Sequence, residues 1–265
     1  MSDPSIPNVS PPQSPRIPQT AVMEEPGMST VETLTSIYFE PGATFEALRS
    51  RPRFLIAGLI TVIVFMAYYT TFVWRVGSET IARAQIEART PDATPEQIDQ
   101  GLELMNSPII KAVTYAAFPL VFAIMFAAGA GLYLLGTMMM AKSITFKQAL
   151  SVWVYSSYPP TVVYGLMNIL LLFLKSPDDI DPTAINSGIA RANPSILVNT
   201  KTQPVLATIL ASFDLIAFYG LFLAVVGLRK VARLSSGSAW MIALAIWVVG
   251  SILRVAMALL FGQAY

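Results

Sequence analysis

Residues 112–140 read AVTYAAFPLVFAIMFAAGAGLYLLGTMMM and contain no charged side chain. A helix needs about 20 mainly apolar residues to cross the hydrocarbon core of a bilayer. This stretch therefore predicts a transmembrane helix. It is longer than a span requires, so we expect the helix to tilt or to protrude from the membrane.

Four further apolar runs of similar length surround this stretch. They cover residues 54–74, 149–174, 205–228 and 239–261. Lipid offers no hydrogen-bond partners, and a helix is the structure in which a single segment forms all of its own backbone hydrogen bonds. The sequence thus predicts an all-α membrane protein, a bundle of five transmembrane helices in one domain over residues 29–265.

The composition agrees with this class and excludes several functions. Of the 265 residues, 54% are hydrophobic and 12% are charged, whereas soluble domains carry about 25% charged residues. The chain has no cysteine and no histidine, which excludes Cys/His metal sites and nucleophile–histidine catalysis. The net charge of +1 gives no field that would favour nucleic acid. We expect no enzyme activity, no metal and no cofactor.

The loops predict how the bundle is oriented. Loops 49–53, 141–148 and 229–238 carry eight basic residues and no acidic one. The longer loops, 75–111 and 175–203, carry seven basic and nine acidic residues. The positive-inside rule places the short basic loops in the cytoplasm. The N-terminus is then cytoplasmic and the C-terminus lies outside.

The segment before the first span divides into a tail and two short helices. Residues 1–28 are rich in proline and serine and predict a disordered cytoplasmic tail. Ser29 and Glu32 have the spacing of a capping box, and Thr44 is placed to cap a second helix that begins at Phe45. Both helices are too short to span, so we expect them at the membrane surface.

The outer loops contain two further patterns. In Thr94-Pro95-Glu96-Gln97, Thr94 can cap a helix whose first residue is Pro95 and whose third is Gln97. This pattern predicts a short amphipathic helix on the outer face. The second outer loop carries three acidic side chains, Asp178, Asp179 and Asp181. They fit either a cation site or a plainly solvated loop, and their spacing is not that of an EF-hand.

Two charged residues, Asp214 and Arg254, lie inside the predicted fourth and fifth spans. Charges within a membrane are costly and normally face the interior of a bundle. The two spans form a hairpin, and both residues lie at about the same depth, ~22 Å from its closed end. We therefore predict a buried ion pair between them, with either a structural role or a role in a proton or substrate relay.

The third span contains two adjacent prolines in its middle, Pro159 and Pro160. Proline removes a helix hydrogen bond and favours a kink. With Tyr155, Tyr158 and Asn168 nearby, the kink either lines a cavity, as broken helices do in transporters, or is only a bend in the helix.

Several short motifs resemble the Yip domain family of Ypt/Rab-interacting membrane proteins and their bacterial relatives. The first is Tyr38-Phe39-Glu40-Pro41, followed by Arg51-Pro52-Arg53 before an apolar run. Later matches are Phe146-Lys147-Gln148-Ala149, Val154-Tyr155 with Pro159, Phe213-Asp214-Leu215 and Gly227-Leu228-Arg229-Lys230. The resemblance covers about residues 35–262, and Thr94-Pro95-Glu96-Gln97 is similar to the bacterial branch.

The resemblance implies a five-span bundle with a cytoplasmic N-terminus and no catalytic residues. Eukaryotic members act in vesicle traffic with small GTPases, and some bacterial members are associated with ABC-type exporters. We expect a non-enzymatic accessory or scaffold protein of the bacterial inner membrane that binds lipid and a membrane-protein partner, with an ABC-type exporter as the complex it helps to assemble. The alternative is a small transporter or lipid-handling protein that uses the kinked third span and Asp214.

Overall fold

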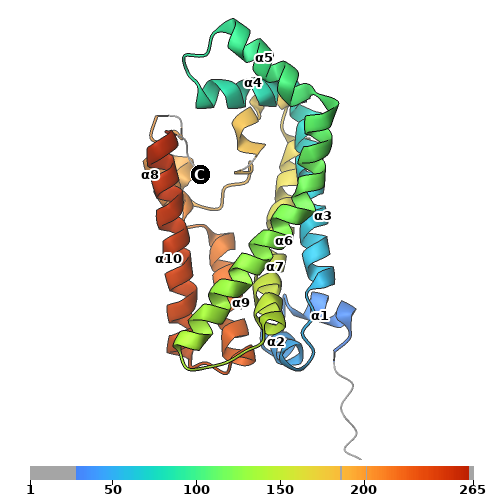
Figure 1. Cartoon of the computed structure of the whole chain (residues 1–265), viewed down its shortest axis with the longest axis vertical. Helices are drawn as coiled ribbons and strands as arrows, with labels where there is room; N and C mark the ends of the chain where they lie inside the picture. The colour runs from blue at the N-terminus through green and yellow to red at the C-terminus, as the bar shows by residue number, and fades with distance from the viewer. Residues whose placement is uncertain (1–27, 186, 201, 263–265) are drawn as a thin grey trace, which may run out of the picture.

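The computed structural model describes residues 28–185, 187–200 and 202–262, and this part of the chain is built from helices (Figure 1). The predicted tail lies outside the described residues, except for Met28. The α-helices are α1 Thr30–Ser36, α2 Pro41–Ser50, α3 Leu55–Val76, α4 Ser78–Arg89, α5 Pro95–Asn106, α6 Pro108–Met139, α7 Phe146–Leu174, α8 Pro204–Ala211, α9 Leu215–Val231 and α10 Ser236–Phe261. Three 3₁₀ turns join α7 to α8: η1 Pro177–Asp179, η2 Pro182–Ile185 and η3 Pro194–Leu197.

Four of these helices, α3, α6, α7 and α10, are each long and apolar enough to cross a membrane, and the pair α8–α9 makes a fifth candidate span. The pair is bent by 43° at a short break. The prediction of one continuous helix over residues 205–228 is therefore wrong. Helix α9 has 17 residues, which is only about 26 Å at 1.5 Å per residue, so it needs α8 to complete the span.

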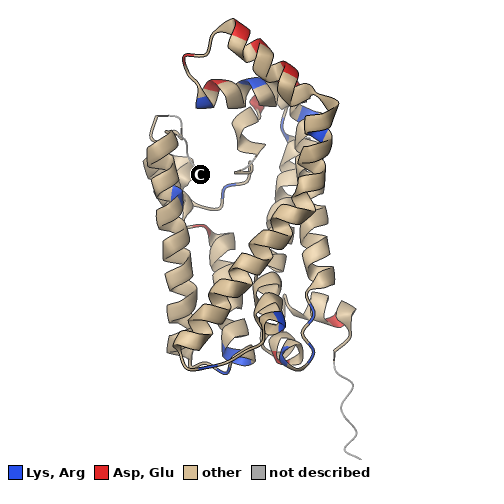
Figure 2. Cartoon of the chain, in the orientation of Figure 1, with Lys and Arg blue, Asp and Glu red and all other residues tan. Residues whose placement is uncertain are grey.

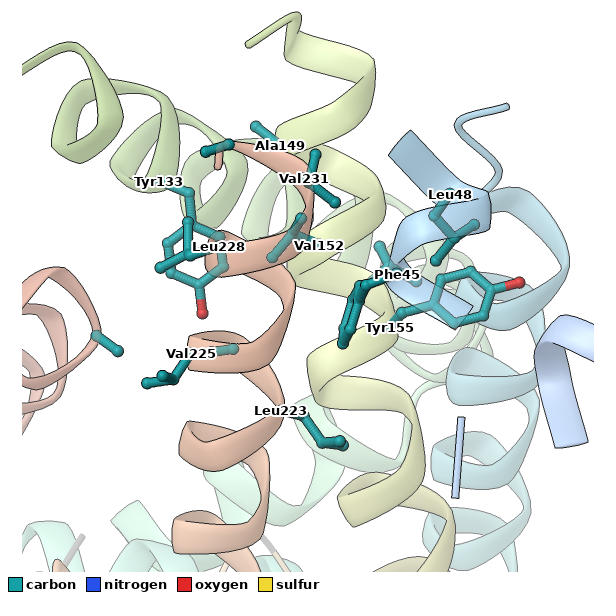
Figure 3. Packing of buried hydrophobic residues seen from close by; sticks show 14 of the residues in the cluster. Phe45, Leu48, Tyr133, Ala149, Val152, Tyr155, Leu223, Val225, Leu228 and Val231 are labelled. Atoms are coloured by element: carbon teal, nitrogen blue, oxygen red, sulfur yellow. The ribbon is translucent and has the colours of Figure 1, made fainter. Parts of the chain in front are cut away.

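Helix α7 is the central element of the bundle. It packs against α3, α6 and α9, whereas α10 lies at the edge beside α8 and α9 (Figure 1). The main hydrophobic core forms where α7, α9 and α2 meet. There Phe45, Val152, Tyr155 and Leu228 are almost fully buried (Figure 3).

One end of the bundle, which we call the basic end, holds α1, α2 and the turns α6–α7 and α9–α10 (Figure 1). Lysine and arginine gather there (Figure 2). The capping box of Ser29 and Glu32 is confirmed at the start of α1. Helix α2 begins at Pro41, and not after Thr44 as predicted, because the proline occupies the first helical position; the Thr44 hydroxyl instead donates to the Glu40 carbonyl at 3.1 Å.

The two N-terminal helices are more than surface helices, because α2 docks into the bundle. Phe45 and Leu48 have no exposed surface. At the same junction the side-chain amide of Gln148, at the start of α7, donates to the Arg49 carbonyl at 2.8 Å. Removing about 150–250 Å² of a single aromatic side chain from solvent stabilises a fold by a few kcal/mol, so α2 is a structural part of the domain.

The opposite end of the bundle carries α4, α5 and the long segment between α7 and α8 (Figure 1). The predicted capping box of Thr94 and Gln97 is confirmed at the start of α5. Helix α4 precedes it and was not predicted. Asn168 of α7 binds the long segment from within the bundle, since its Oδ1 accepts from the backbone N–H of Ile189 and Ala190 at 2.6 and 2.9 Å.

Candidate functional site

The break in the fourth span is organised around the Asp214 carboxylate. Asp214 is the N-cap of α9, and its Oδ1 accepts from the N–H groups of Ile216 and Ala217 at 2.9 and 3.1 Å. Its Oδ2 accepts from Nδ2 of Asn193 at 2.8 Å. The backbone N–H of Leu215 also donates to the carbonyl of Ala192, at 3.1 Å. The carboxylate at the break in the fourth candidate span thus begins a helix and holds the long segment.

The predicted ion pair between Asp214 and Arg254 is not formed within the described part of the chain. Arg254 is exposed on α10, and its nearest hydrogen-bond partner is the Ser251 hydroxyl at 3.5 Å. Instead, the break before α9 lets the Asp214 carboxylate bind the first N–H groups of that helix and the side-chain amide of Asn193, which make three donors in all. A salt bridge at the basic end joins Arg49 and Glu46, at 3.0 Å.

The third span stays helical across its two prolines. Helix α7 runs from Phe146 to Leu174 with Pro159 and Pro160 in its interior. The hydroxyls of Ser156 and Ser157 both donate to the Trp153 carbonyl, at 2.9 and 2.8 Å. The hydroxyl groups of both serines therefore lie along the helical turn just before the prolines.

The three polar side chains predicted to accompany the prolines point to different parts of the fold. The Tyr155 hydroxyl lies 3.0 Å from that of Thr33 and so contacts α1. The ring of Tyr158 packs edge-on against Tyr38, with centroids 5.8 Å apart. Burial, together with the Tyr158 hydroxyl, raises the pKa of Tyr38, so this phenol stays neutral. Asn168 binds the long segment at the opposite end, as described above.

A cavity of about 250 Å³ lies within the bundle, between α6, α7, α9 and α10. Of the five residues predicted at the kink, Pro160 alone lines it. The lining also includes three hydroxyl side chains and three large aromatic ones, which are Ser156, Ser157, Thr161, Tyr133, Trp153 and Trp247. Small residues of α9 and α10 complete the walls, among them Ala217, Gly220 and Ala243.

The path of α6 explains why this cavity exists. Helices α6 and α10 approach closely at Gly136, where a Cβ atom would lie 2.7 Å from the Ile242 side chain. Beyond this contact α6 crosses the bundle diagonally and moves away from α10 (Figure 1). Tyr133 on α6 and Trp247 on α10 are each about one turn of helix away from this contact, and both line the cavity. The cavity therefore lies where the two helices separate.

Aromatic rings give the cavity rigid walls. The rings of Tyr133 and Trp153 pack at 4.9 Å between centroids. Trp247 lies against Phe213 and Phe218, at 5.8 and 5.9 Å. Its Nε1–H is buried and has no acceptor among the described residues. An apolar pocket with a few polar groups is the usual form of a small-molecule site, so this cavity is the candidate site.

Comparison with known proteins identifies the family. A family model of the Yip1 domain matches residues 35–257. The chain belongs to the Yip1 domain family. Neither the curated proteins nor the solved structures that were compared with it include a match.

The Yip1 domain match extends from within α1 to within α10, so it includes the cavity, the docked α2 and the broken span. The chain is accordingly a multi-pass membrane protein of a family whose members are not known as enzymes. The apolar candidate spans agree independently with that assignment.

The Yip motif residues of the N-terminal segment organise the turns at the basic end. Glu40 is the N-cap residue of α2 and Pro41 is its first residue, while Arg51 ends the helix. Pro52 follows in the link to α3. The guanidinium of Arg53 donates from Nη1 to the backbone carbonyl of Met28 and to the hydroxyl of Thr30, at 3.1 and 3.2 Å. These residues fix α1 and α2 against the bundle and do not line the cavity.

Sequence reasoning missed the tryptophans of the cavity and the partner of Asp214. Tryptophan favours the membrane interface, so Trp247, which lies near the middle of its span, was a usable signal. Asn193 had no such signal, since it lies in a loop rich in polar residues. Among the described residues, no group of three or more side chains is placed to hold a metal ion; Asp181 instead accepts from the backbone and hydroxyl of Thr183.

Proposed function

We propose that this Yip1 domain protein is a non-enzymatic membrane scaffold that binds another integral membrane protein, with a subunit of an ABC-type exporter as the partner class. The observation that carries the proposal is the uneven packing of the bundle. Within their most apolar windows, 33% of α3 is buried but only 17% of α6 and 6% of α10. Most of the apolar residues of α6 and α10 are therefore left uncovered by the rest of the described chain and can contact lipid or another protein.

Small residues on these open surfaces support a role in helix association. A Cβ added at Gly131 on α6 or at Gly250 on α10 would meet no atom within 4 Å. Glycine at a membrane helix surface lets a second helix approach closely. We therefore assign the surfaces around these two glycines as the contact faces for the partner.

The basic end supports the orientation that we propose. Eight basic residues and no acidic one occupy its three loops, 49–53, 141–148 and 229–238. In a bacterial inner membrane this end would face the cytoplasm, together with α1 and α2. The C-terminal end of α10 would then lie on the periplasmic side.

The test is partner capture from native membranes in mild detergent, compared between the wild type and two surface variants. Gly250→Leu and Gly131→Leu add a side chain where the chain itself leaves room, so both should fold as the wild type does. We expect a stoichiometric membrane protein with the wild type and at least a fivefold loss with one variant. Equal capture by all three proteins, or a wild type that purifies alone, would contradict the proposal.

The cavity favours a second candidate function, the handling of a lipid. Its walls come from four membrane helices and are mainly apolar. Asp214 is not among its lining residues, so a lipid-handling role would use the third span without that carboxylate. Binding of a hydrophobic ligand to the purified protein is the readout for this candidate.

A further inference from the structure

We propose that the cavity binds the hydroxyl end of a neutral membrane lipid, and that the backbone carbonyl of Ser156 accepts the hydrogen bond from that hydroxyl. This inference rests on the lipid-handling candidate and names its ligand class. It joins three features: a carbonyl without a helix partner, an opening beside it, and apolar walls within the membrane.

The covalent structure of α7 deprives the Ser156 carbonyl of its helix donors. In an α-helix this oxygen would accept from the N–H of residue 160, and in a 3₁₀ turn from that of residue 159. Both residues are proline, which has no N–H. A buried carbonyl without a donor costs roughly 1–3 kcal/mol, so an external donor at this point is favoured.

Gly220 leaves this carbonyl uncovered on the side of α9. An added Cβ atom at Gly220 would lie 3.4 Å from the Ser156 oxygen and 3.3 Å from Cγ of Pro160. Both Ser156 and Gly220 line the cavity. Because glycine has no side chain, α9 places no side chain over the carbonyl at this position.

A second polar group lies close to the first along the chain. Thr161 also lines the cavity, and its side chain carries a hydroxyl group that can donate and accept a hydrogen bond. It can donate to the oxygen of a ligand hydroxyl whose proton is given to the Ser156 carbonyl. A hydroxyl group, which both donates and accepts, matches this pair of sites.

The depth and size of the cavity restrict the rest of the ligand. Ser156 lies ten residues into α7, which begins at Phe146, so it is about 15 Å from the basic end of the helix. A charged headgroup is costly at that depth, whereas one hydrogen-bonded hydroxyl is not. About 250 Å³ is below the roughly 300–1,000 Å³ of pockets that enclose a drug-sized ligand, so only one end of a lipid enters. Long-chain alcohols, diacylglycerols and polyprenols share this chemistry.

The experiment uses photolabelling of the full-length protein in lipid nanodiscs. The probe is a long-chain alcohol that carries a diazirine close to the hydroxyl and an alkyne at the far end. Its matched control is the methyl ether of the same molecule, which cannot donate. We expect the alcohol to label cavity residues on α7 and α10, including the peptides of Trp153 and Trp247, and the ether to label them at least fivefold less.

Two proline variants separate the carbonyl from a general effect on the helix. Pro160→Ala restores the N–H that bonds the Ser156 carbonyl, whereas Pro159→Ala restores the partner of the Tyr155 carbonyl, outside the cavity lining. We expect alcohol labelling to fall about fivefold to tenfold in P160A and to stay within twofold of wild type in P159A. Gly220→Ala, which covers the carbonyl, should resemble P160A. Thermal stability of each variant in the same nanodiscs verifies that it is folded.

The outcomes also distinguish this inference from the candidate function it rests on. If alcohol and ether label the cavity equally, or if P160A keeps full labelling, the carbonyl is not the acceptor, although a lipid still enters. If neither probe labels the cavity of the wild type, lipid handling through this cavity is contradicted as well. Partner capture through α6 and α10 is independent of both results.

Discussion

The third and fourth spans respond to their sequences in opposite ways. Helix α7 contains two adjacent prolines and remains one helix of 29 residues, whereas the fourth span contains no proline after Pro204 and breaks between α8 and α9. The difference shows that proline content alone does not decide where a membrane helix ends. The contacts that each segment makes with the rest of the fold decide it.

Each span has its own set of contacts. Helix α7 packs against α3, α6 and α9, and the hydroxyls of Ser156 and Ser157 donate to the Trp153 carbonyl just before the prolines. At the start of α9 the Asp214 carboxylate accepts from the first N–H groups, and the long segment after α7 supplies the Ala192 carbonyl. The break is therefore stabilised by a cap and a loop, and the continuous helix by packing.

The largest effect is expected from removal of the cap. Asp214→Ala deletes the acceptor of two backbone N–H groups and of the Asn193 amide, which should lower the free energy of unfolding by about 3 kcal/mol. Asp214→Asn retains a capping oxygen and should cost about 1 kcal/mol. Thermal unfolding in one detergent measures both variants. Equal losses would show that the charge, and not the cap, matters.

Packing around α7 is tested by two glycines of α6. A Cβ atom at Gly129 would lie 2.0 Å from the Trp153 ring, whereas one at Gly131 would meet no atom within 4 Å. Gly129→Ala should therefore destabilise the protein by about 2 kcal/mol through overpacking, and Gly131→Ala should change its stability by less than about 0.5 kcal/mol. The melting temperatures of the two variants provide the comparison. A tolerated Gly129→Ala would mean that α6 can move away from α7.

A smaller effect is expected from the link between the break and the long segment. Asn193→Ala removes one hydrogen bond to the Asp214 carboxylate and the acceptor of the Ser195 N–H and hydroxyl, but it leaves the cap of α9 in place. We expect a loss of about 1 kcal/mol, and faster proteolysis of the segment between α7 and α8. If Asn193→Ala lowers the free energy of unfolding as much as Asp214→Ala does, the loop stabilises the break between α8 and α9 more than the cap does.

The smallest effect is expected at the proline turn. Pro159→Ala adds one helix hydrogen bond, worth about 1 kcal/mol, and removes ring contacts of similar value. The free energy of unfolding should change by less than about 1 kcal/mol, measured by the same thermal assay. A change above about 2 kcal/mol in either direction would show that α7 depends on the proline for its shape.

Hydropathy predicted the helical class and the place of four candidate spans, because membrane helices need long apolar runs whatever their neighbours are. Local spacing likewise predicted the capping boxes of Ser29 and Thr94, since a cap involves residues only three positions apart. The bundle class, the family and these helix starts were therefore accessible from the sequence.

The break at Asp214 and the cavity were not accessible in this way. Asp214 and Arg254 were paired on depth alone, but the true partner of Asp214 is Asn193, which reaches it from a loop. The cavity depends on the crossing of α6 relative to α10, and that crossing is set by side-chain packing at Gly136 and Ile242. Such tertiary geometry leaves no periodic pattern in a single sequence.

The most direct test of the central claim, that the Asp214 carboxylate holds the break while packing holds α7, is hydrogen exchange in lipid nanodiscs. We compare the wild type with Asp214→Ala at the amides of residues 215–217 and at those of residues 146–157. The account predicts at least tenfold faster exchange at the start of α9 and no change in α7. Unchanged exchange at residues 215–217, or equal acceleration in both helices, would contradict it.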